Sequence, residues 1–368
     1  MSERKVVASE AQQTPGDLAP AGISVPPGRR RLGAGEPSRP GPDGTGGRRR
    51  SPAARPSGVH PRRRDSGRGA ARTIAAAWPY LLVLPTVAGT AYLLFYPLLR
   101  SVVISFQHFR TGELIRGGAA FVGLENYQDV LGSAEFWTVV RRTLVWTAVN
   151  VVLIMVISTF TALMIARLGR RMRLAVMSGL VLTWATPVLA ATTVFQWLFQ
   201  SRLGVVNWAL VSLGFDSFDG FSWFANGQAT FAIMVLLVVW QSVPFAALTL
   251  YAGLTTIPAE LYESARIDGA GAWQIFRDVT FPMLRPLFGL ITSLEVIWVF
   301  KCFAQIWAIT QGGPDDATTT LPVYAFQVAQ SLHKYDLGSA ISTLTVLILL
   351  VVLVAHLRRM YKHEGEGL

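Results

Sequence analysis

Residues 257–282 read IPAELYESARIDGAGAWQIFRDVTFP, a polar stretch between two long apolar runs at 230–251 and 287–309. Pro258 suits the first turn of a helix, where the missing backbone donor is harmless. Gly269 falls about ten residues later and marks a reversal of the chain, since glycine readily adopts turn conformations. The stretch therefore predicts a helix, a turn and a second helix in a loop between two membrane spans.

The rest of the chain repeats this alternation of apolar runs and short polar segments. It is 51% hydrophobic and only 15% charged over 368 residues, which is too apolar for two soluble domains. A helix that crosses a membrane needs about 20 largely apolar residues. The sequence therefore predicts an all-α polytopic membrane protein, with a domain at 73–361 and six transmembrane helices at about 77–99, 144–166, 176–199, 230–251, 287–309 and 339–357.

Residues 1–72 are of a different kind. They are rich in Arg, Pro, Gly and Ser and hold most of the net charge of +11. Such a composition buries too little apolar surface to offset the entropy of ordering, which predicts a disordered tail. Residues 362–368 form a short C-terminal tail by the same analysis. The basic excess belongs to the N-terminal tail, so we expect no nucleic acid partner.

Basic residues also set the expected orientation. They gather in the N-terminal tail, between spans two and three, and after span six. The positive-inside rule then places both termini and the 257–282 loop in the cytoplasm of a multi-pass protein of the bacterial plasma membrane. Arg141 and Arg142 precede span two on the opposite side, where we expect them to snorkel to the headgroups.

The sequence offers no catalytic residues and no metal site. Its single cysteine, Cys302, lies in an apolar run and can form neither a disulfide framework nor a thiolate site. A phosphate-binding loop of the form Gly-x-x-x-x-Gly-Lys-Ser/Thr does not occur. We therefore expect no enzyme activity and no cofactor bound by the chain.

The 257–282 loop closely resembles the cytoplasmic signature of binding-protein-dependent ABC permeases, a Glu-Ala-Ala triplet followed by Gly and an aliphatic-x-Leu-Pro. Ser264 in place of Ala and Phe281 in place of Leu depart from that signature but keep a small and an apolar side chain. The matching positions are Glu263, Ser264, Ala265, Gly269, Val279, Phe281 and Pro282.

The resemblance implies that the first helix of the loop docks in a cleft of a separate ATPase subunit, with Glu263 in a polar contact. It also implies a second permease subunit in a heterodimer, two ATPase subunits that hydrolyse the ATP, and an extracytoplasmic solute-binding protein. The residues expected to couple the ATPase to the membrane domain are Glu263, Ser264, Ala265, Asp268, Gly269, Ala270 and Pro282.

Three further motifs resemble the sugar and glycerol-3-phosphate (maltose-type) branch of these permeases. They are FVGLENY at 121–127, TQGGP at 310–314 and YDLGSA at 335–340. A carbohydrate is therefore the expected substrate. An ABC permease for amino acids, peptides or polyamines is the alternative within transport, and it would share the loop but lack these motifs. A stand-alone secondary transporter, and a protein whose Arg-rich tail binds nucleic acid or anionic lipid, are the alternatives of other classes.

Polar side chains within the spans are candidates for substrate contact, because such groups are expensive in hydrocarbon. Glu295, Trp298, Cys302 and Gln305 recur near helical spacing, which predicts one helix face with a carboxylate, a ring and an amide. Sugars bind to sets of aromatic rings and fixed polar groups. The predicted pathway residues are Gln241, Glu295, Trp298 and Gln305, while Lys301 is expected to reach the headgroups.

Overall fold

The computed structural model describes residues 67–365, with side chains over residues 82–360. The predicted N-terminal tail at 1–72 lies outside the described residues except for 67–72, which belong to the first helix, α1. Residues 366–368 of the predicted C-terminal tail also lie outside them, whereas 362–365 belong to the last helix.

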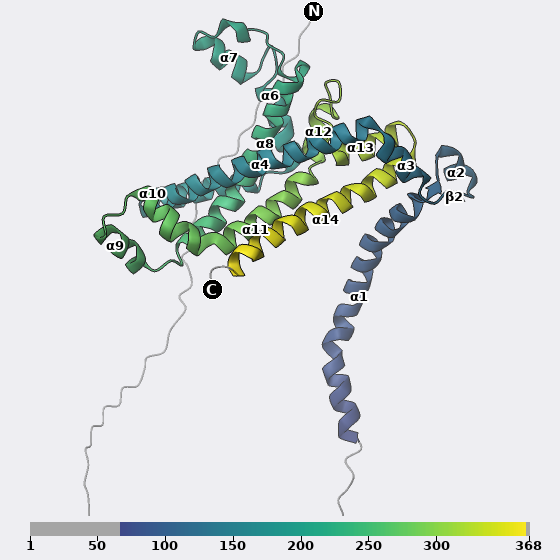
Figure 1. The fold of residues 1–368 in the computed structure, drawn as a ribbon, viewed down its shortest axis with the longest axis horizontal. Helices are drawn as coiled ribbons and strands as arrows, with labels where there is room; N and C mark the ends of the chain where they lie inside the picture. Colours follow the sequence, from purple (N-terminus) through teal and green to yellow (C-terminus); the bar gives the residue numbers. More distant parts are fainter. Residues whose placement is uncertain (1–66, 366–368) are drawn as a thin grey trace, which may run out of the picture. The chain divides into compact units, whose positions relative to one another are not determined.

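Helices make up most of the described chain (Figure 1), which confirms the predicted all-α class. Two strands of two residues pair antiparallel, with Gln107 opposite Phe121 and His108 opposite Ala120. The elements up to the middle of the chain are α1 (Gly67–Ile104), β1 (Gln107–His108), α2 (Thr111–Arg116), β2 (Ala120–Phe121), α3 (Glu125–Gly132), α4 (Ala134–Arg167), α5 (Arg170–Trp184), α6 (Val188–Leu198), α7 (Val205–Ser212) and the short turns η1 (Asp216–Phe218) and η2 (Trp223–Ala225).

The second half of the described chain contains the long helices α8, α11 and α14 and the 257–282 loop. Its elements are α8 (Gly227–Leu254), α9 (Ala259–Ile267), α10 (Ala272–Ile275), the π-helical turn η3 (Phe276–Thr280), α11 (Phe281–Phe300), α12 (Ala304–Thr310), α13 (Leu321–Phe326), the π-helical turn η4 (Gln327–Ser331) and α14 (Tyr335–Gly365).

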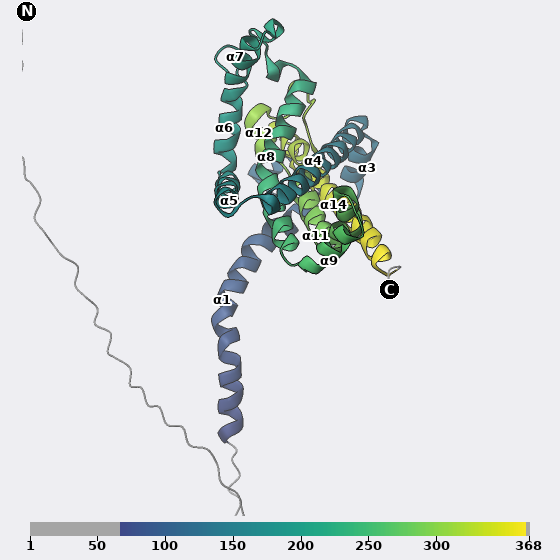
Figure 2. The same ribbon diagram turned by 90° about the vertical axis from the view of Figure 1, so that its left-hand side faces the viewer.

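Five helices in the described residues are long and apolar enough to cross a membrane, and α5 with α6 makes a sixth if the bent pair is one span. The expected spans at 144–166, 230–251 and 339–357 fall inside α4, α8 and α14. The prediction of a single continuous helix at 176–199 was wrong, because α5 and α6 meet at 99° (Figure 2). Pro187 between them lacks a backbone donor and disfavours helical geometry at the residue before it.

The span expected at 287–309 lies within one candidate membrane span, Ala272–Thr310, but its helix is interrupted. Helix α11 ends at Phe300, and α12 begins at Ala304 after a non-helical segment. Phe303 has φ −124° and ψ −54°, outside the regular helical range, although neither glycine nor proline interrupts the segment. Because of the break, side chains after Phe300 do not continue the helix face that regular helical spacing predicts for them.

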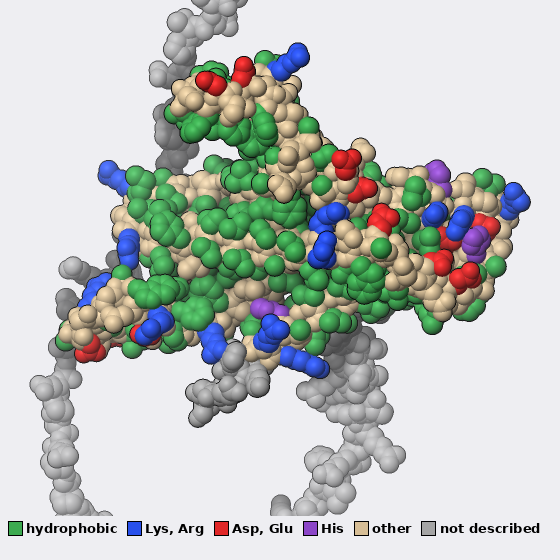
Figure 3. Space-filling view, turned by 45° about the horizontal axis from the view of Figure 1, so that its top comes forward, with side chains coloured by type: hydrophobic (Ala, Val, Ile, Leu, Met, Phe, Trp, Pro, Cys, Tyr) green, Lys and Arg blue, Asp and Glu red, His purple; other side chains and the backbone are tan. Residues whose placement is uncertain are grey.

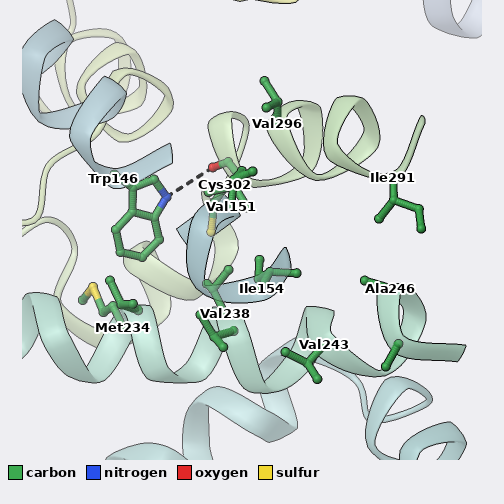
Figure 4. Close-up of a cluster of buried hydrophobic side chains, with 14 of the residues drawn as sticks. Trp146, Val151, Ile154, Met234, Val238, Val243, Ala246, Ile291, Val296 and Cys302 are labelled. Atoms are coloured by element: carbon green, nitrogen blue, oxygen red, sulfur yellow. Dashed lines mark hydrogen bonds between the residues drawn. The ribbon is translucent and has the colours of Figure 1, made fainter. Parts of the chain in front are cut away.

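The main apolar core lies where α4, α8 and α11 pack together. Figure 4 shows Trp146 of α4 with its indole Nε1 donating a hydrogen bond of 3.2 Å to the carbonyl of Val299 in α11. One face of α4 continues the contact towards α8, where the Ser158 hydroxyl donates to the Val243 carbonyl at 3.2 Å. Two interhelical bonds inside an apolar cluster fix the register of the three helices.

A second cluster joins α3, the start of α4, α13 and α14. Here Arg142 donates a hydrogen bond of 3.1 Å to the carbonyl of Thr319, in the loop before α13. A loop distant in sequence thus supplies a backbone acceptor for the Arg142 guanidinium, and snorkelling of this residue to the headgroups stays a prediction.

Candidate functional site

The loop between α8 and α11 begins with helix α9. Pro258 precedes its first helical residue with an extended ψ of 136°, and Glu260 supplies negative charge to the first turn. The hydroxyls of Tyr262 in α9 and Thr280 in η3 are 3.4 Å apart, which ties the two arms of the hairpin together. The predicted helix, turn and helix are all present (Figure 1).

Gly269 ends α9 with a left-handed backbone, at φ 76°. The amide of Ala270 donates to the carbonyl of Ala265 at 2.9 Å, and the amide of Asp268 donates to Ser264 at 3.0 Å. This arrangement satisfies carbonyls that the end of a helix leaves without partners, and glycine is the residue that adopts it without strain.

The second arm of the hairpin continues past Pro282. Helix α10 passes through the π-helical turn η3 directly into α11, and Pro282 lies in the first turn of α11. The wider turn is closed by the Phe281 amide, which bonds to the Phe276 carbonyl. The second arm of the loop is therefore continuous with a membrane span.

The coupling residues predicted from the sequence lie mostly on the surface. Glu263, Ser264, Asp268 and Gly269 are exposed, while Ala265 and Ala270 are half-buried. Helix α9 buries none of its residues, and Ile267 is 85% exposed. An apolar side chain this exposed on a polar loop leaves a surface that fits contact with another protein.

A cavity of about 630 Å³ lies where the two helix breaks meet α8. The break between α5 and α6 and the break between α11 and α12 both contribute to its wall. Its lining consists of Trp184, Thr186, Pro187, Val188, Gln241, Ser242, Trp298, Lys301, Cys302, Phe303, Ala304 and Gln305. Non-helical backbone at membrane depth is tolerated where it is buried in protein or lines a cavity.

Polar and aromatic groups in this cavity are held in place by one another. Gln305 donates from Nε2 to Oε1 of Gln241 at 3.2 Å, and Cys302 donates from Sγ to Oε1 of Gln305 at 3.1 Å. Trp184 and Trp298 both pack on Phe245, with ring centroids 6.1 and 5.0 Å from its ring. The cavity thus combines fixed amides with indole rings, the set that binds the polar and apolar faces of a sugar.

Glu295 does not join the other predicted pathway residues in the cavity lining. It is fully buried, and both carboxylate oxygens lack a hydrogen-bond partner among the described residues. The Ser242 side chain, which does line the cavity, lies beside it. The structure therefore brings Gln241, Trp298 and Gln305 together and places Glu295 in the core behind them.

Most of the cavity lining, including Trp184 and Lys301, was not among the predicted pathway residues. Trp184 looked like part of a continuous span, although Pro187 three residues later is the signal of the break. Lys301 was expected to reach the headgroups, but its exposed side chain lines the cavity because α11 ends one residue earlier.

Residues 154–363 match the family model described as "Binding-protein-dependent transport system inner membrane component". The chain belongs to this family. Its members are membrane components of transport systems, so this permease is a multi-pass transport subunit of the plasma membrane and not an enzyme. The family prediction from the 257–282 loop is confirmed.

Two curated relatives of the permease are named for sugar uptake. The diacetylchitobiose uptake system permease protein DasB of Streptomyces coelicolor is 48% identical over 85% of this chain and 98% of its own. The trehalose/maltose transport system permease protein MalF of Thermococcus litoralis is 32% identical over 76% of this chain and 92% of its own.

The permease also resembles a solved structure. A chain of a bacterial ABC transporter for import of the acidic polysaccharide alginate superposes with a TM-score of 0.68, at 18% identity, over 80% of this chain and 99% of that one. At this identity the likeness shows the fold.

Proposed function

We propose that this permease is a membrane-spanning subunit of an ATP-driven importer for a carbohydrate, a sugar or oligosaccharide. The observation that carries the proposal is the cavity, in which two broken helices converge on the Gln241 and Gln305 amides and two indole rings. Broken helices around a shared polar site are typical of the substrate sites of transporters. The printed names of the sugar-uptake relatives support the same substrate class.

The α9 helix is the proposed contact with a separate ATPase subunit. Its exposed Glu263 offers a charge, and its exposed Ile267 offers an apolar side chain, on a helix that has no fully buried residue. Since α10 continues through η3 into α11, a displacement of α9 is transmitted to the span that ends at the cavity. ATP is bound and hydrolysed by two such partner subunits.

Alternating access requires that the permease has two discrete conformations. Binding of the ATPase and binding of the substrate must each shift the equilibrium between them. The breaks after Trp184 and Phe300 are the proposed hinges, because the backbone there lacks the continuous ladder of helical hydrogen bonds. Both hinges border the cavity, so a change at either one alters the position of a substrate-binding side chain.

The proposed partner within the membrane is a second permease subunit, in a heterodimer. Helix α1 supports this, because its residues 82–99 are largely apolar and none of them is buried within this chain. The substrate is delivered by an extracytoplasmic solute-binding protein. Both termini, the 1–72 tail and the 257–282 loop lie on the cytoplasmic side in this proposal, as the distribution of Arg and Lys favours.

The first test of the proposal is co-purification. The permease is expressed with its candidate ATPase, second permease and binding protein, and each subunit is quantified after extraction in mild detergent. The matched variants are Glu263→Gln and Glu260→Gln, which remove one exposed carboxylate each from the same helix. We expect Glu263→Gln to lower ATPase recovery and Glu260→Gln to leave it near the wild-type level.

The second test is uptake by the assembled complex in liposomes. We expect ATP-dependent accumulation of an oligosaccharide from a panel that also contains amino acids, short peptides and polyamines. The ATP-driven importer would be ruled out if the wild type retained no ATPase subunit, or if uptake needed only an ion gradient. Accumulation of an amino acid in preference to every sugar would reject the substrate class and leave the ATPase coupling intact.

A further inference from the structure

An apolar groove of about 770 Å³ lies at the end of the bundle opposite the cavity's helix breaks, between the last turns of α4 and the α10, η3 and α11 segments. Aliphatic and aromatic side chains from both sides form its walls. Those that carry the argument are Met155, Phe160 and Leu163 of α4, with Phe276 and Phe288 from the other side. No side chain of the described residues fills this space.

The rim of the groove has the side chains of a membrane interface. Trp273 is 70% exposed and stacks on Phe276 with centroids 5.6 Å apart. Exposed Arg167 lines the groove at the end of α4. Indole rings favour the depth of the headgroups, and arginine reaches the same depth from an apolar stem. Trp273 and Arg167 are therefore side chains of the types expected where a lipid acyl chain meets its headgroup.

Positive charge continues beyond Arg167. Arg170 and Arg171 are exposed in the first turn of α5, which contains no acidic residue. Neither they nor Arg167 has an ion pair or a side-chain hydrogen bond among the described residues. Cations at the positive end of a helix are unfavourable unless an anion lies nearby. Figure 3 shows blue side chains beside green surface at the left-hand end of the bundle, the end that α4 and α10 reach in Figure 1.

The neighbouring Arg173 differs from Arg167, Arg170 and Arg171 because its guanidinium has contacts within the chain. Its Nη2 donates to the carbonyl of Leu168 at 2.9 Å, and its guanidinium lies 5.8 Å from the ring centroid of Tyr251. Leu168 itself lines the groove. One arginine thus orders the turn between α4 and α5, and the three others are left to meet an external anion.

We propose that this groove binds one anionic phospholipid, with an acyl chain between Phe160, Leu163 and Phe288 and its phosphate against Arg167, Arg170 and Arg171. Guanidinium groups bind phosphate through paired hydrogen bonds, and the apolar walls bury the chain. The bound lipid bridges α4 and the α10 segment, so it stabilises the position of the loop that carries α9. This lipid site requires only that the chain spans a membrane. It is therefore independent of the proposed substrate and of the proposed ATPase contact.

The test is native mass spectrometry of the full-length permease from equal mixtures of phosphatidylglycerol and phosphatidylcholine. We expect the wild type to retain phosphatidylglycerol in preference, and Arg167→Gln or Arg171→Gln to weaken that retention about fivefold each, as one kcal/mol per basic residue gives. The matched control is Arg358→Gln with Arg359→Gln, two exposed arginines at the end of α14. Retention in that control should equal the wild type.

A second pair of variants tests the acyl site. Leu163→Trp fills the groove and should release both lipids, whereas Leu182→Trp, at an exposed position of α5 outside the groove, should release neither. Thermal unfolding of each variant shows that it is folded. Equal retention of the two lipids by the wild type, or an equal loss from the Arg358 and Arg359 control, overturns the proposal. Loss of phosphatidylglycerol when the other subunits assemble, with Leu163 cross-linking to one of them, would assign the groove to a protein instead.

Discussion

Gln305 of α12 and Gln241 of α8 are joined by a hydrogen bond of 3.2 Å across the cavity wall, although 64 positions separate them in the chain. The bond links the short helix after the α11 break to the uninterrupted helix α8. Cys302 adds a second bond to the same amide at 3.1 Å. A substrate that binds these amides must replace or bridge the interaction between them, so binding and helix position are coupled at this point.

The first prediction concerns this pair. Replacement of either glutamine by leucine leaves a polar group in the cavity wall without its partner, and we expect each variant to lose about 1 kcal/mol of stability. The double variant should lose less than the sum, because neither unpaired amide remains. Chemical or thermal unfolding in detergent measures the stability of the wild type, the two single variants and the double variant. Uptake assays should show a raised KM for the sugar in both single variants. Additive losses would mean that the bond contributes nothing.

The second prediction compares two glycines of the 257–282 loop. Gly269 has φ 76°, and a side chain there is strained by about 1–2 kcal/mol, whereas Gly271 has φ −72° and an extended backbone that any residue adopts. We expect Gly269→Val to reduce ATPase co-purification and uptake together, and Gly271→Ala to leave both near the wild-type level. An added Cβ at Gly271 meets only the Gln274 side chain, at 3.7 Å. Wild-type levels of ATPase co-purification and uptake in Gly269→Val would show that the shape of this turn is unimportant.

A third prediction follows from the buried Asp336 at the start of α14. Its carboxylate accepts hydrogen bonds from the amides of Leu337 at 2.8 Å and Phe109 at 3.3 Å, and it lies 3.4 Å from Nε of Arg110. Asp336→Ala leaves buried donors without an acceptor, so we expect a loss of about 1–3 kcal/mol in unfolding free energy. Asp129→Ala, at an exposed position of α3, is the control and should change little. Equal stability of the two variants would mean that the hydrogen bonds to the Asp336 carboxylate contribute little to folding.

The fourth prediction concerns Glu295 in the core. A charged carboxylate without partners is strongly unfavourable in such a site, whereas a neutral amide of the same shape avoids that charge. We expect Glu295→Gln to fold and melt at least as well as the wild type, and Glu295→Lys to fail to accumulate in the membrane. Glu125→Gln, at an exposed position of α3, provides the comparison for charge removal. A strongly destabilised Glu295→Gln would show that the site contains an unseen partner for the ionised carboxylate.

The sequence by itself determined the fold class and the family. Long apolar runs can only be accommodated as membrane helices, because hydrocarbon leaves no other partner for backbone polar groups. The first helix of the 257–282 loop and the turn after it were also predictable, since Pro258, Gly269 and the polar residues around them act through local backbone preferences. These features depend on residues close together in the chain, which a sequence displays directly.

Tertiary structure alone decided where the spans break and which side chains meet. Pro244 lies inside the continuous helix α8, whereas Pro187 marks a 99° bend, so proline by itself does not fix a break. The segment after Phe300 breaks with neither proline nor glycine, and its place against α8 brings Gln305 to Gln241. Helical spacing was then a poor guide to Glu295, which faces the core. Hydrophobicity measures whether a segment prefers the membrane, but the packing of other helices against it decides whether its helix is continuous and which face is buried.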